Sequence, residues 1–457
     1  MKAISTWSHH PYCPLLADVG DIYICRVSPT ETTILFEWLP CDGPYTVFYK
    51  KREDTDFIRF GETADTACEI VGLCPDTDYA FYVTAGKKKS RVRLARCGKS
   101  VGTVVNYLHP DDACYAFSGR YLCSPSLVRL PDGALLASMD VYAHAHPQNL
   151  TLIFRSEDDG ATWHHWSELM PCFWGSLFWH KDALYMLSCS TEYGDLQIGR
   201  SDDGGKTFSA PVALLRGSNG KNGGCGAHRN PQNILSYNGR LYASLEWGAW
   251  ANKDYGHAAM MMSCDENADL LDPTSWHFTP PKRFDVFAPE LEGLSPSTMT
   301  IEGTPVLAPD GRLLNVMRFG KYQKALCYEV NTNDPDAPLT YAGLISFPAN
   351  YSKFMIKTDP VTGDYYSIGT RVYDPEHTGA RDLLSLLRSR DLVHWEVVCD
   401  LFDYRGIDQK HIGFQYVSFQ IEGDDILYLC RTALNGAHSY HDSNYSTFHR
   451  IKNFRQM

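Results

Sequence analysis

The sequence contains no run of about 18 consecutive apolar residues, the length that a membrane-spanning helix needs. Its first ten residues also lack the apolar core of a secretory signal. We therefore expect a cytoplasmic protein with no membrane partner. Basic side chains are not in excess either: 42 Lys and Arg stand against 54 Asp and Glu, a net charge of −12. This balance argues against nucleic acid as a partner but allows a small anion held by a local group of arginines.

A disulfide framework is not expected, because the 15 cysteines are odd in number and scattered along 457 residues. Two short pairs, Cys225 with His228 and His438 with His441, have spacings that a zinc ion could use. A structural zinc therefore stays open, and no cofactor is expected to be required. The chain exceeds what one hydrophobic core usually serves, so we expect two or three domains.

Residues 21–105 are expected to form a small β-sandwich, preceded by an N-terminal segment, 1–20, whose packing on the next domain stays open. Short alternating stretches at 22–27, 33–38 and 45–50 each end in a turn rich in Pro, Asp or Gly. The stretch 72–79 resembles the fibronectin type III signature, in which a Tyr hydroxyl bonds back to upstream backbone. The resemblance implies a module that spaces or binds.

One unit recurs from residue 106 to 457: two apolar strands joined by an Asp-Gly or Asn-Gly turn, a polar excursion, and two further strands. First strands begin near Ser124, Ser176, Gln232, Thr304, Phe354 and Gln415. Units of this length are β-propeller blades. We expect an all-β chain with a six-bladed propeller, with seven blades left open. The last unit ends early, so a segment between about 100 and 123 is expected to supply its missing strand.

Polar residues gather in the loops after second strands and in the links into first strands, which share one face of such a propeller. Three of them, Arg318, Arg371 and Arg431, follow second strands at positions that we take as equivalent. Guanidinium groups bind carboxylates bidentately, so the three predict a clamp for an anion; the alternative is that they bridge loop carbonyls or acids. The other residues expected at this rim are His144, Tyr193, His228, Glu246, Trp247, Lys353, Gln415, Tyr416, His438 and His441.

Two hairpins, 155–163 and 200–208, resemble the Asp-box of sialidase-like propellers, with a weaker copy at 388–395. Their acidic residues are expected to shape turns and not to catalyse. The whole propeller resembles BNR-repeat proteins related to ulvan-type uronate lyases, on stretches 173–185, 190–194, 302–311, 352–354, 413–416 and 437–454. That resemblance implies His228 and Tyr193 as proton carriers. Met139 stands where relatives tend to have a histidine, and two alternatives stay open: His144 or His146 takes its place, or the chemistry has changed or been lost.

These features predict an enzyme that acts on anionic, uronate-containing oligosaccharides. The main hypothesis is a lyase, in which the clamp neutralises a uronate so that its C5 proton can be removed. The first alternative is an exo-acting, sialidase-like glycoside hydrolase with two carboxyl groups chosen from Asp140, Glu246 and Glu302. Two observations argue against this alternative. The Phe-Arg-Ile-Pro motif of true sialidases is not found, since the corresponding strand reads Pro-Ser-Leu-Val-Arg over 125–129, and no Tyr–Glu nucleophile pair is evident. The second alternative is a non-catalytic carbohydrate-binding propeller.

Overall fold

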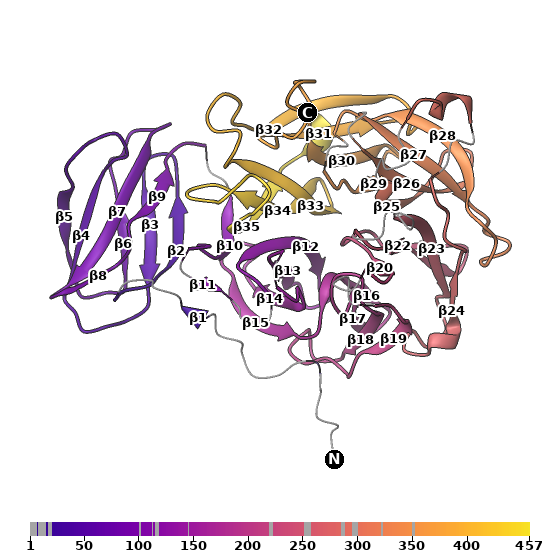
Figure 1. The fold of residues 1–457 in the computed structure, drawn as a ribbon, viewed down its shortest axis with the longest axis horizontal. Helices are drawn as coiled ribbons and strands as arrows, with labels where there is room; N and C mark the ends of the chain where they lie inside the picture. The colour runs from indigo at the N-terminus through magenta and orange to yellow at the C-terminus, as the bar shows by residue number, and fades with distance from the viewer. Residues whose placement is uncertain are drawn as a thin grey trace, which may run out of the picture.

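A computed structural model describes residues 7, 15–16, 21–99, 102–111, 113–114, 118–144, 146–218, 223–250, 257–284, 288–294, 300–320, 323–349 and 352–457. Within these residues the regular elements are β-strands and three short 3-10 turns, and none of the helical turns is long and apolar enough to cross a membrane. The strands form a small sandwich beside a larger ring of sheets (Figure 1). The all-β prediction is confirmed.

The sandwich consists of two sheets. One contains β2 (Ile24–Pro29), β3 (Ile34–Trp38) and β6 (Ala67–Ile70); the other contains β4 (Tyr45–Lys51), β5 (Ile58–Thr63), β7 (Asp78–Ala85), β8 (Lys88–Lys89) and β9 (Arg93–Arg96). Alternate side chains face inward, and Phe36 packs against Trp38 and Phe81 with ring centroids 5.4 and 4.6 Å apart. The hydroxyl of Tyr79 accepts a hydrogen bond from the backbone N–H of Cys74 at 2.9 Å, the upstream contact expected of this corner.

The ring contains six blades of antiparallel strands in the described residues. The first five follow chain order, and in blade 3 the first strand is divided into two segments that pair with the same neighbour. Blade 1 is β12 (Tyr121–Arg129), β13 (Leu135–Tyr142), β14 (Leu150–Ser156), β15 (His164–Leu169). Blade 2 is β16 (Phe173–His180), β17 (Ala183–Cys189), β18 (Leu196–Ser201), β19 (Val212–Leu215). Blade 3 is β20 (Gly226–His228), β21 (Leu235–Tyr237), β22 (Arg240–Gly248), β23 (Ala258–Asp265), β24 (Trp276–Phe278). Blade 4 is β25 (Thr300–Leu307), β26 (Leu313–Phe319), β27 (Lys324–Val330), β28 (Thr340–Ser346). Blade 5 is β29 (Ile356–Thr358), β30 (Tyr365–Thr370), β31 (Leu383–Ser389), β32 (Trp395–Asp403).

The sixth blade joins the two ends of the propeller. Its strands β33 (Gly413–Glu422), β34 (Asp425–Ala433) and β35 (Tyr445–Ile451) are completed by β10 (Thr103–Tyr107), which comes from the segment before blade 1. Thr103 pairs with Phe448, and Tyr107 pairs with Tyr445. The outermost strand of this blade is therefore the one expected from residues 100–123. Closure in this way joins the two ends of the propeller by main-chain hydrogen bonds and covers the outer edge of β35.

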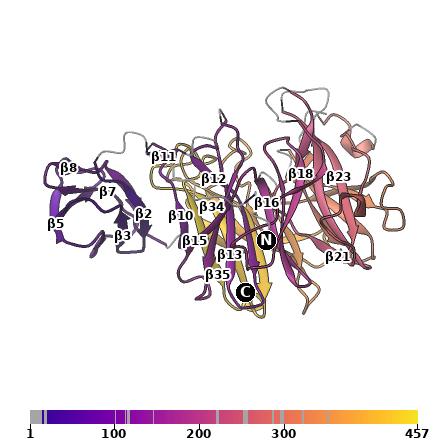
Figure 2. The ribbon, with the colours of Figure 1, turned by 90° about the horizontal axis from the view of Figure 1, so that it is seen from below.

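The sandwich packs against this closing region (Figure 2). Arg26 donates to the carbonyl of Val104 at 3.4 Å, and the backbone N–H of Arg96 donates to Asn435 at 2.8 Å. Of the N-terminal segment only a few residues are described. Among them Trp7 is buried against the propeller, where its indole N–H donates to the carbonyl of Pro171 at 2.7 Å.

The Asp-box hairpins connect third and fourth strands, on the face opposite the second-to-third loops. In the first box a carboxylate oxygen of Asp158 accepts from the Thr162 N–H and from the Ser156 hydroxyl, both at 2.8 Å. Trp163 packs beneath, and its indole N–H donates to the carbonyl of Gly160 at 3.1 Å. These contacts stabilise the turn, and they lie on the face of the propeller opposite the loop-rich face.

Candidate functional site

The loop-rich face of the ring encloses a cavity of about 320 Å³ to which all six blades contribute lining residues. Its floor is built by a distortion that recurs in four inner strands. In blades 1, 2, 4 and 6 the ladder pairing skips at one point, and there Ser124, Trp174, Glu302 and Tyr416 adopt positive φ values of 49°, 54°, 60° and 56°. Each of the four lines the cavity. Bulges re-aim side chains, so this repeated bulge brings chemically different residues to the propeller axis.

Arg318, Arg381 and Arg431 form the cationic wall of the cavity. Arg318 and Arg431 lie on second strands, and each pairs with the residue just before a bulge, Ile301 and Gln415 respectively. Their equivalence is therefore real. Arg381 comes instead from the loop that leads into β31, at a parallel bridge to the start of β33. Three blades thus deliver one guanidinium each to a single enclosed space.

The expected position of Arg371 is corrected by the structure. Its guanidinium lies 3.5 Å from Asp400 on the outer strand β32, away from the cavity. The preceding residue, Thr370, is buried and its hydroxyl donates to the carbonyl of Phe414 at 2.8 Å. Successive side chains of a strand point to opposite sides, so Arg371 faces outward where Thr370 faces inward. The third guanidinium of the cavity is that of Arg381.

A tyrosine and a glutamate meet beside these arginines, although the sequence showed no such pair. The hydroxyl of Tyr416 donates to Glu302 Oε1 at 2.7 Å, and Asn230 donates to the same oxygen at 2.8 Å. Arg318 donates to Glu302 Oε2 at 2.8 Å. The pair is not evident in the sequence, because bulges in blades 4 and 6 bring together residues 114 positions apart.

The protonation states of this pair follow from its surroundings. Burial alone would raise the pKa of Glu302, but the neighbouring Arg318 and the hydrogen bond from Tyr416 hold that pKa below its usual value. Burial and the Glu302 charge raise the pKa of Tyr416 to about 12. At neutral pH the site therefore contains an ionised carboxylate that accepts from a neutral phenol. A carboxylate in this state can take the phenol proton when the phenol oxygen attacks an electrophile.

Arg431 is held mainly by neutral groups. It donates to the hydroxyl of Tyr142 at 2.8 Å, and its guanidinium carbon lies 5.0 Å and 4.9 Å from the ring centres of Tyr142 and Tyr416. Arg381 lies 5.7 Å from the Tyr416 ring and bonds the side chain of Gln415. Together with the 3.5 Å contact between Arg318 and the Tyr416 hydroxyl, these contacts arrange three cations around one tyrosine. A carboxylate is the ligand that such a group of guanidinium forks favours.

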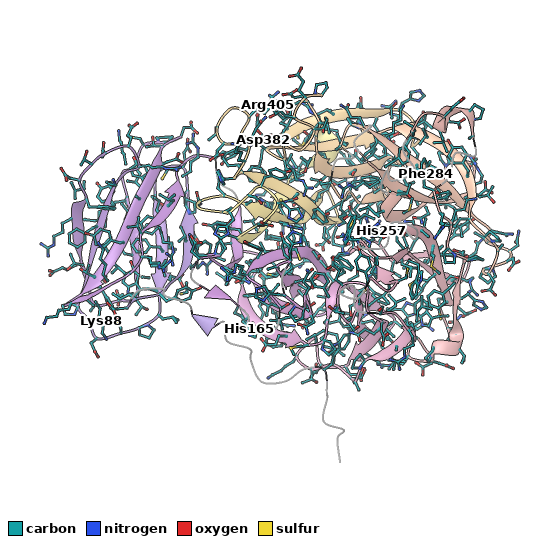
Figure 3. The ribbon with its side chains drawn as sticks, in the orientation of Figure 1. Lys88, His165, His257, Phe284, Asp382 and Arg405 are labelled. Atoms are coloured by element: carbon teal, nitrogen blue, oxygen red, sulfur yellow. The ribbon has the colours of Figure 1, made fainter. Side chains whose placement is uncertain are left out.

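The opposite part of the cavity wall is aromatic and includes His228, whose Nδ1 lies 2.6 Å from Glu246 Oε2. Behind it the Tyr193 hydroxyl lies 2.8 Å from Nε2 of His257, which Figure 3 labels inside the ring. Burial lowers the pKa of His257 well below its usual value and raises that of Tyr193. Both rings are thus neutral, and Tyr193, 1% exposed, stands behind the wall. Trp174, the bulge residue of blade 2, packs against this cluster, with its ring centre 4.3 Å from that of His228.

The remaining predicted residues divide into two groups. His144 and His441 line the cavity, and burial together with Arg431 lowers the pKa of His441 to about 3. The described cavity wall does not include Trp247, Lys353, Gln415 or His438. Lys353 is buried and donates to the carbonyl of Val417 at 2.8 Å; burial lowers its pKa to about 7.

His438 lies 2.6 Å from Asp111, and Gln415 donates to the carbonyl of Tyr440 at 2.6 Å. Trp247 pairs with Ala227 and Ala258 within its sheet. These contacts hold loops and blades together. In the described part of the chain no group of three or more His, Cys, Asp or Glu side chains is arranged to hold a metal ion.

Two of the three acids considered for hydrolysis support the bulges from behind. Asp140 accepts from the backbone N–H of Trp174 at 2.6 Å and from the Thr151 hydroxyl at 2.5 Å. Glu246 accepts from the N–H of Gly303, next to Glu302, at 3.2 Å. A carboxyl group on the second strand of one blade thus fixes the bulge in the next blade. Of the three, the cavity wall includes Glu302.

The environment of Asp140 predicts a dependence of stability on pH. Burial raises its pKa to about 7, far above the unfolded value, so the folded state favours the protonated acid. The contribution of Asp140 to the free energy of unfolding is therefore complete below about pH 4. It is lost as the pH rises through 7, at up to about 1.4 kcal/mol per pH unit. We expect Asp140→Asn to remove this slope. Unfolding midpoints of both proteins between pH 4 and 8 test this, and parallel curves would contradict it.

No protein-family model matches the sequence, and no curated protein does. The fold, however, is shared with solved structures. The Hadza microbial sialidase Hz136 superposes with a TM-score of 0.54 at 14% identity, over 97% of this chain and 98% of that one. An α-L-arabinanase from Penicillium chrysogenum, complexed with arabinobiose, gives 0.52 at 15% identity, over 78% and 98%. Trypanosoma rangeli sialidase gives 0.51 at 16% identity, over 76% and 56%. The sialidase-like propeller fold is thereby confirmed.

Proposed function

We propose that this protein is an exo-acting glycoside hydrolase that releases a carboxylated sugar through a covalent intermediate on Tyr416. The observation that carries the proposal is the Tyr416–Glu302 contact of 2.7 Å inside a cavity walled by three arginines. A cavity of about 320 Å³ suits a terminal sugar residue better than the interior of a polymer. The sialidase and arabinanase structures of the same fold agree with carbohydrate chemistry in such a propeller.

The position of the arginines suggests where the sugar bears its carboxylate. All three guanidinium groups surround Tyr416, and Arg318 lies 3.5 Å from the attacking hydroxyl. A carboxylate held there would sit next to the carbon that the hydroxyl attacks. The substrate class is therefore a 2-keto sugar acid, whose anomeric carbon carries the carboxylate. In a hexuronate the carboxylate is attached at C5, across the ring oxygen from the anomeric carbon.

A neutral nucleophile suits this substrate. A carboxylate nucleophile would be repelled by the negative charge of the carboxylate attached to the attacked carbon, whereas a phenol carries no charge until it reacts. As the Tyr416 oxygen bonds to the anomeric carbon, the bond from that carbon to the departing glycosidic oxygen breaks. The phenol proton passes to Glu302, whose carboxylate is stabilised beforehand by Arg318. Water then attacks the same carbon and displaces the tyrosine oxygen. Two displacements retain the anomeric configuration.

A lyase is the second candidate, favoured by the contact of His228 with Glu246 and of Tyr193 with His257 beside the cavity. Such groups could move the proton that β-elimination requires. Hydrolysis has the stronger support. Tyr416 lines the cavity at the arginine wall and contacts an ionised carboxylate, whereas Tyr193 lies behind the wall and contacts a neutral histidine.

The products distinguish the three functions. Purified protein would be incubated with short acidic glycans ending either in a 2-keto sugar acid or in a hexuronate, with Glu302→Gln as the control. Hydrolysis releases the free terminal sugar acid and generates no new ultraviolet absorbance, which is the expected result. A conjugated, absorbing product would establish a lyase. Saturable binding without any product, across both substrate classes, would indicate a carbohydrate-binding propeller.

A further inference from the structure

The first displacement requires a group that gives a proton to the departing oxygen, and Glu302 is not suited to this role. Both of its carboxylate oxygens already accept hydrogen bonds, from Tyr416 and Asn230 on one oxygen and from Arg318 on the other. Its lowered pKa also keeps it ionised. Hydrolysis of a glycoside uses two groups placed on either side of the bond, so a second acid is needed.

The second carboxyl group at the described cavity wall is Glu192. It belongs to the loop between β17 and β18 of blade 2 and is half-buried, so its carboxyl can meet both a ligand and water. Gln148, from the corresponding loop of blade 1, donates to Glu192 Oε2 at 3.4 Å. This contact is with a neutral amide, whereas Glu302 is held in an ion pair with Arg318.

The loop that carries Glu192 is fixed at both sides. Within it, the backbone N–H of Ser190 donates to the carbonyl of Asp195 at 2.8 Å, and that of Gly194 donates to Thr191 at 2.9 Å. The hydroxyl of Thr191 donates to the carbonyl of Pro147 in blade 1. A carboxyl on a loop held in this way keeps a defined position relative to the floor of the cavity.

The blade order places Glu192 across the cavity from the clamp. In a ring of six, blade 2 faces blade 5, which supplies Arg381, and it is two blades away from both Glu302 and Tyr416. A sugar whose carboxylate is bound by the arginines directs its departing group toward the opposite wall. That wall includes Glu192.

We propose that Glu192 is the general acid and base of the reaction; this inference rests on the proposed hydrolase function. In the first step the protonated Glu192 gives its proton to the glycosidic oxygen while the bond from that oxygen to the anomeric carbon breaks. The Tyr416 oxygen forms the new bond, and the phenol proton moves to Glu302. In the second step the Glu192 carboxylate takes a proton from water, whose oxygen bonds to the anomeric carbon. The Tyr416 oxygen departs and recovers its proton from Glu302.

The test compares Glu192→Gln with wild type on two glycosides of the same sugar acid, one with an alkyl and one with a nitrophenyl leaving group. Nitrophenolate departs without a proton, so the variant should lose about 10²- to 10⁴-fold in kcat/KM on the alkyl glycoside and far less on the nitrophenyl one. Added azide, which needs no base, should accelerate the variant on the nitrophenyl substrate and yield a glycosyl azide. The wild-type pH profile should lose one limb in the variant.

Two further variants make the outcome decisive. Glu157→Gln changes an exposed glutamate in the first Asp-box turn, on the opposite face, and should match wild type on both substrates. His144→Ala removes the exposed histidine that also lines the cavity. If His144→Ala, and not Glu192→Gln, shows the leaving-group dependence, the proposal is overturned. An equal loss on both glycosides in Glu192→Gln overturns it too. If wild type cleaves neither glycoside, the proposed function itself fails.

Discussion

Replacing Tyr416 with phenylalanine is expected to reduce hydrolysis by about 10³-fold or more while leaving the fold intact. The variant lacks the oxygen that forms the bond to the anomeric carbon, and loss of a nucleophile is among the most severe single changes in an enzyme. Glu302 keeps its bonds to Arg318 and Asn230, so the bulge that carries it should persist. Steady-state rates on the best substrate, together with the unfolding midpoint, measure both effects.

A matched control is Tyr121→Phe. Tyr121 is a tyrosine of the inner strand β12, outside the cavity lining, and its hydroxyl lies 2.8 Å from His438 Nδ1. This variant should retain activity within a few-fold of wild type. If Tyr416→Phe folds normally and keeps more than a tenth of the wild-type rate, Tyr416 is not the nucleophile.

The second large effect is expected at the arginine wall. Arg431→Gln should lower kcat/KM by about 10- to 100-fold, since a hydrogen bond to a charged group contributes about 1.5–3 kcal/mol. The loss should be confined to substrates that carry the carboxylate. A substrate in which the carboxylate is replaced by a carboxamide should be poor for wild type and little worse for the variant, because the interaction that the mutation removes is already absent.

Arg371→Gln is the matched control for this prediction. Arg371 lies in the preceding blade at a position that looks equivalent in the sequence, yet its partner is Asp400 on an outer strand. Its replacement should leave the preference for the carboxylate unchanged. Equal effects of the Arg371 and Arg431 variants on that preference would contradict the assignment of the clamp.

The architecture was predictable because propeller blades depend on local pattern. Paired apolar strands, Asp-Gly turns and Asp-boxes each specify their own hairpin, and the shortened last unit indicated that β10 would close the ring. The face that carries the site followed from strand alternation. The sequence also identified two arginines of the cavity, Arg318 and Arg431, since both lie near the end of a second strand.

The parts of the site that were missed depend on single-residue shifts of register. Arg371 comes one residue after the inward-facing Thr370, so its side chain points outward. Arg381 follows a ten-residue loop, where strand periodicity predicts no side-chain direction. The Tyr–Glu pair arises from bulges, which simple alternation does not foresee. A signal for these bulges is nevertheless present in the sequence. The four bulged inner strands read Cys-Ser-Pro-Ser at 123–126, Phe-Trp-Gly-Ser at 173–176, Ile-Glu-Gly-Thr at 301–304 and Gln-Tyr-Val-Ser at 415–418.

The shared feature of these strands is a hydroxyl residue two positions after the residue that enters the cavity. In two of the four, that hydroxyl accepts a backbone N–H of the next inner strand: Leu177 donates to Ser126 at 3.0 Å, and Leu127 donates to Ser418 at 3.2 Å. The hydroxyl residue therefore joins neighbouring blades at the axis. Its recurrence could have identified Glu302 and Tyr416 as neighbours in space.

The covalent intermediate on Tyr416 is the central claim, and mass spectrometry of the trapped enzyme tests it most directly. A fluorinated analogue of the released sugar acid, with a good leaving group, slows the second displacement and lets the intermediate accumulate. The account predicts one added glycosyl mass in the peptide that contains Tyr416, and none in the Tyr416→Phe variant. A glycosyl adduct on a different residue, or turnover of the true substrate with inversion at the anomeric carbon, would contradict it.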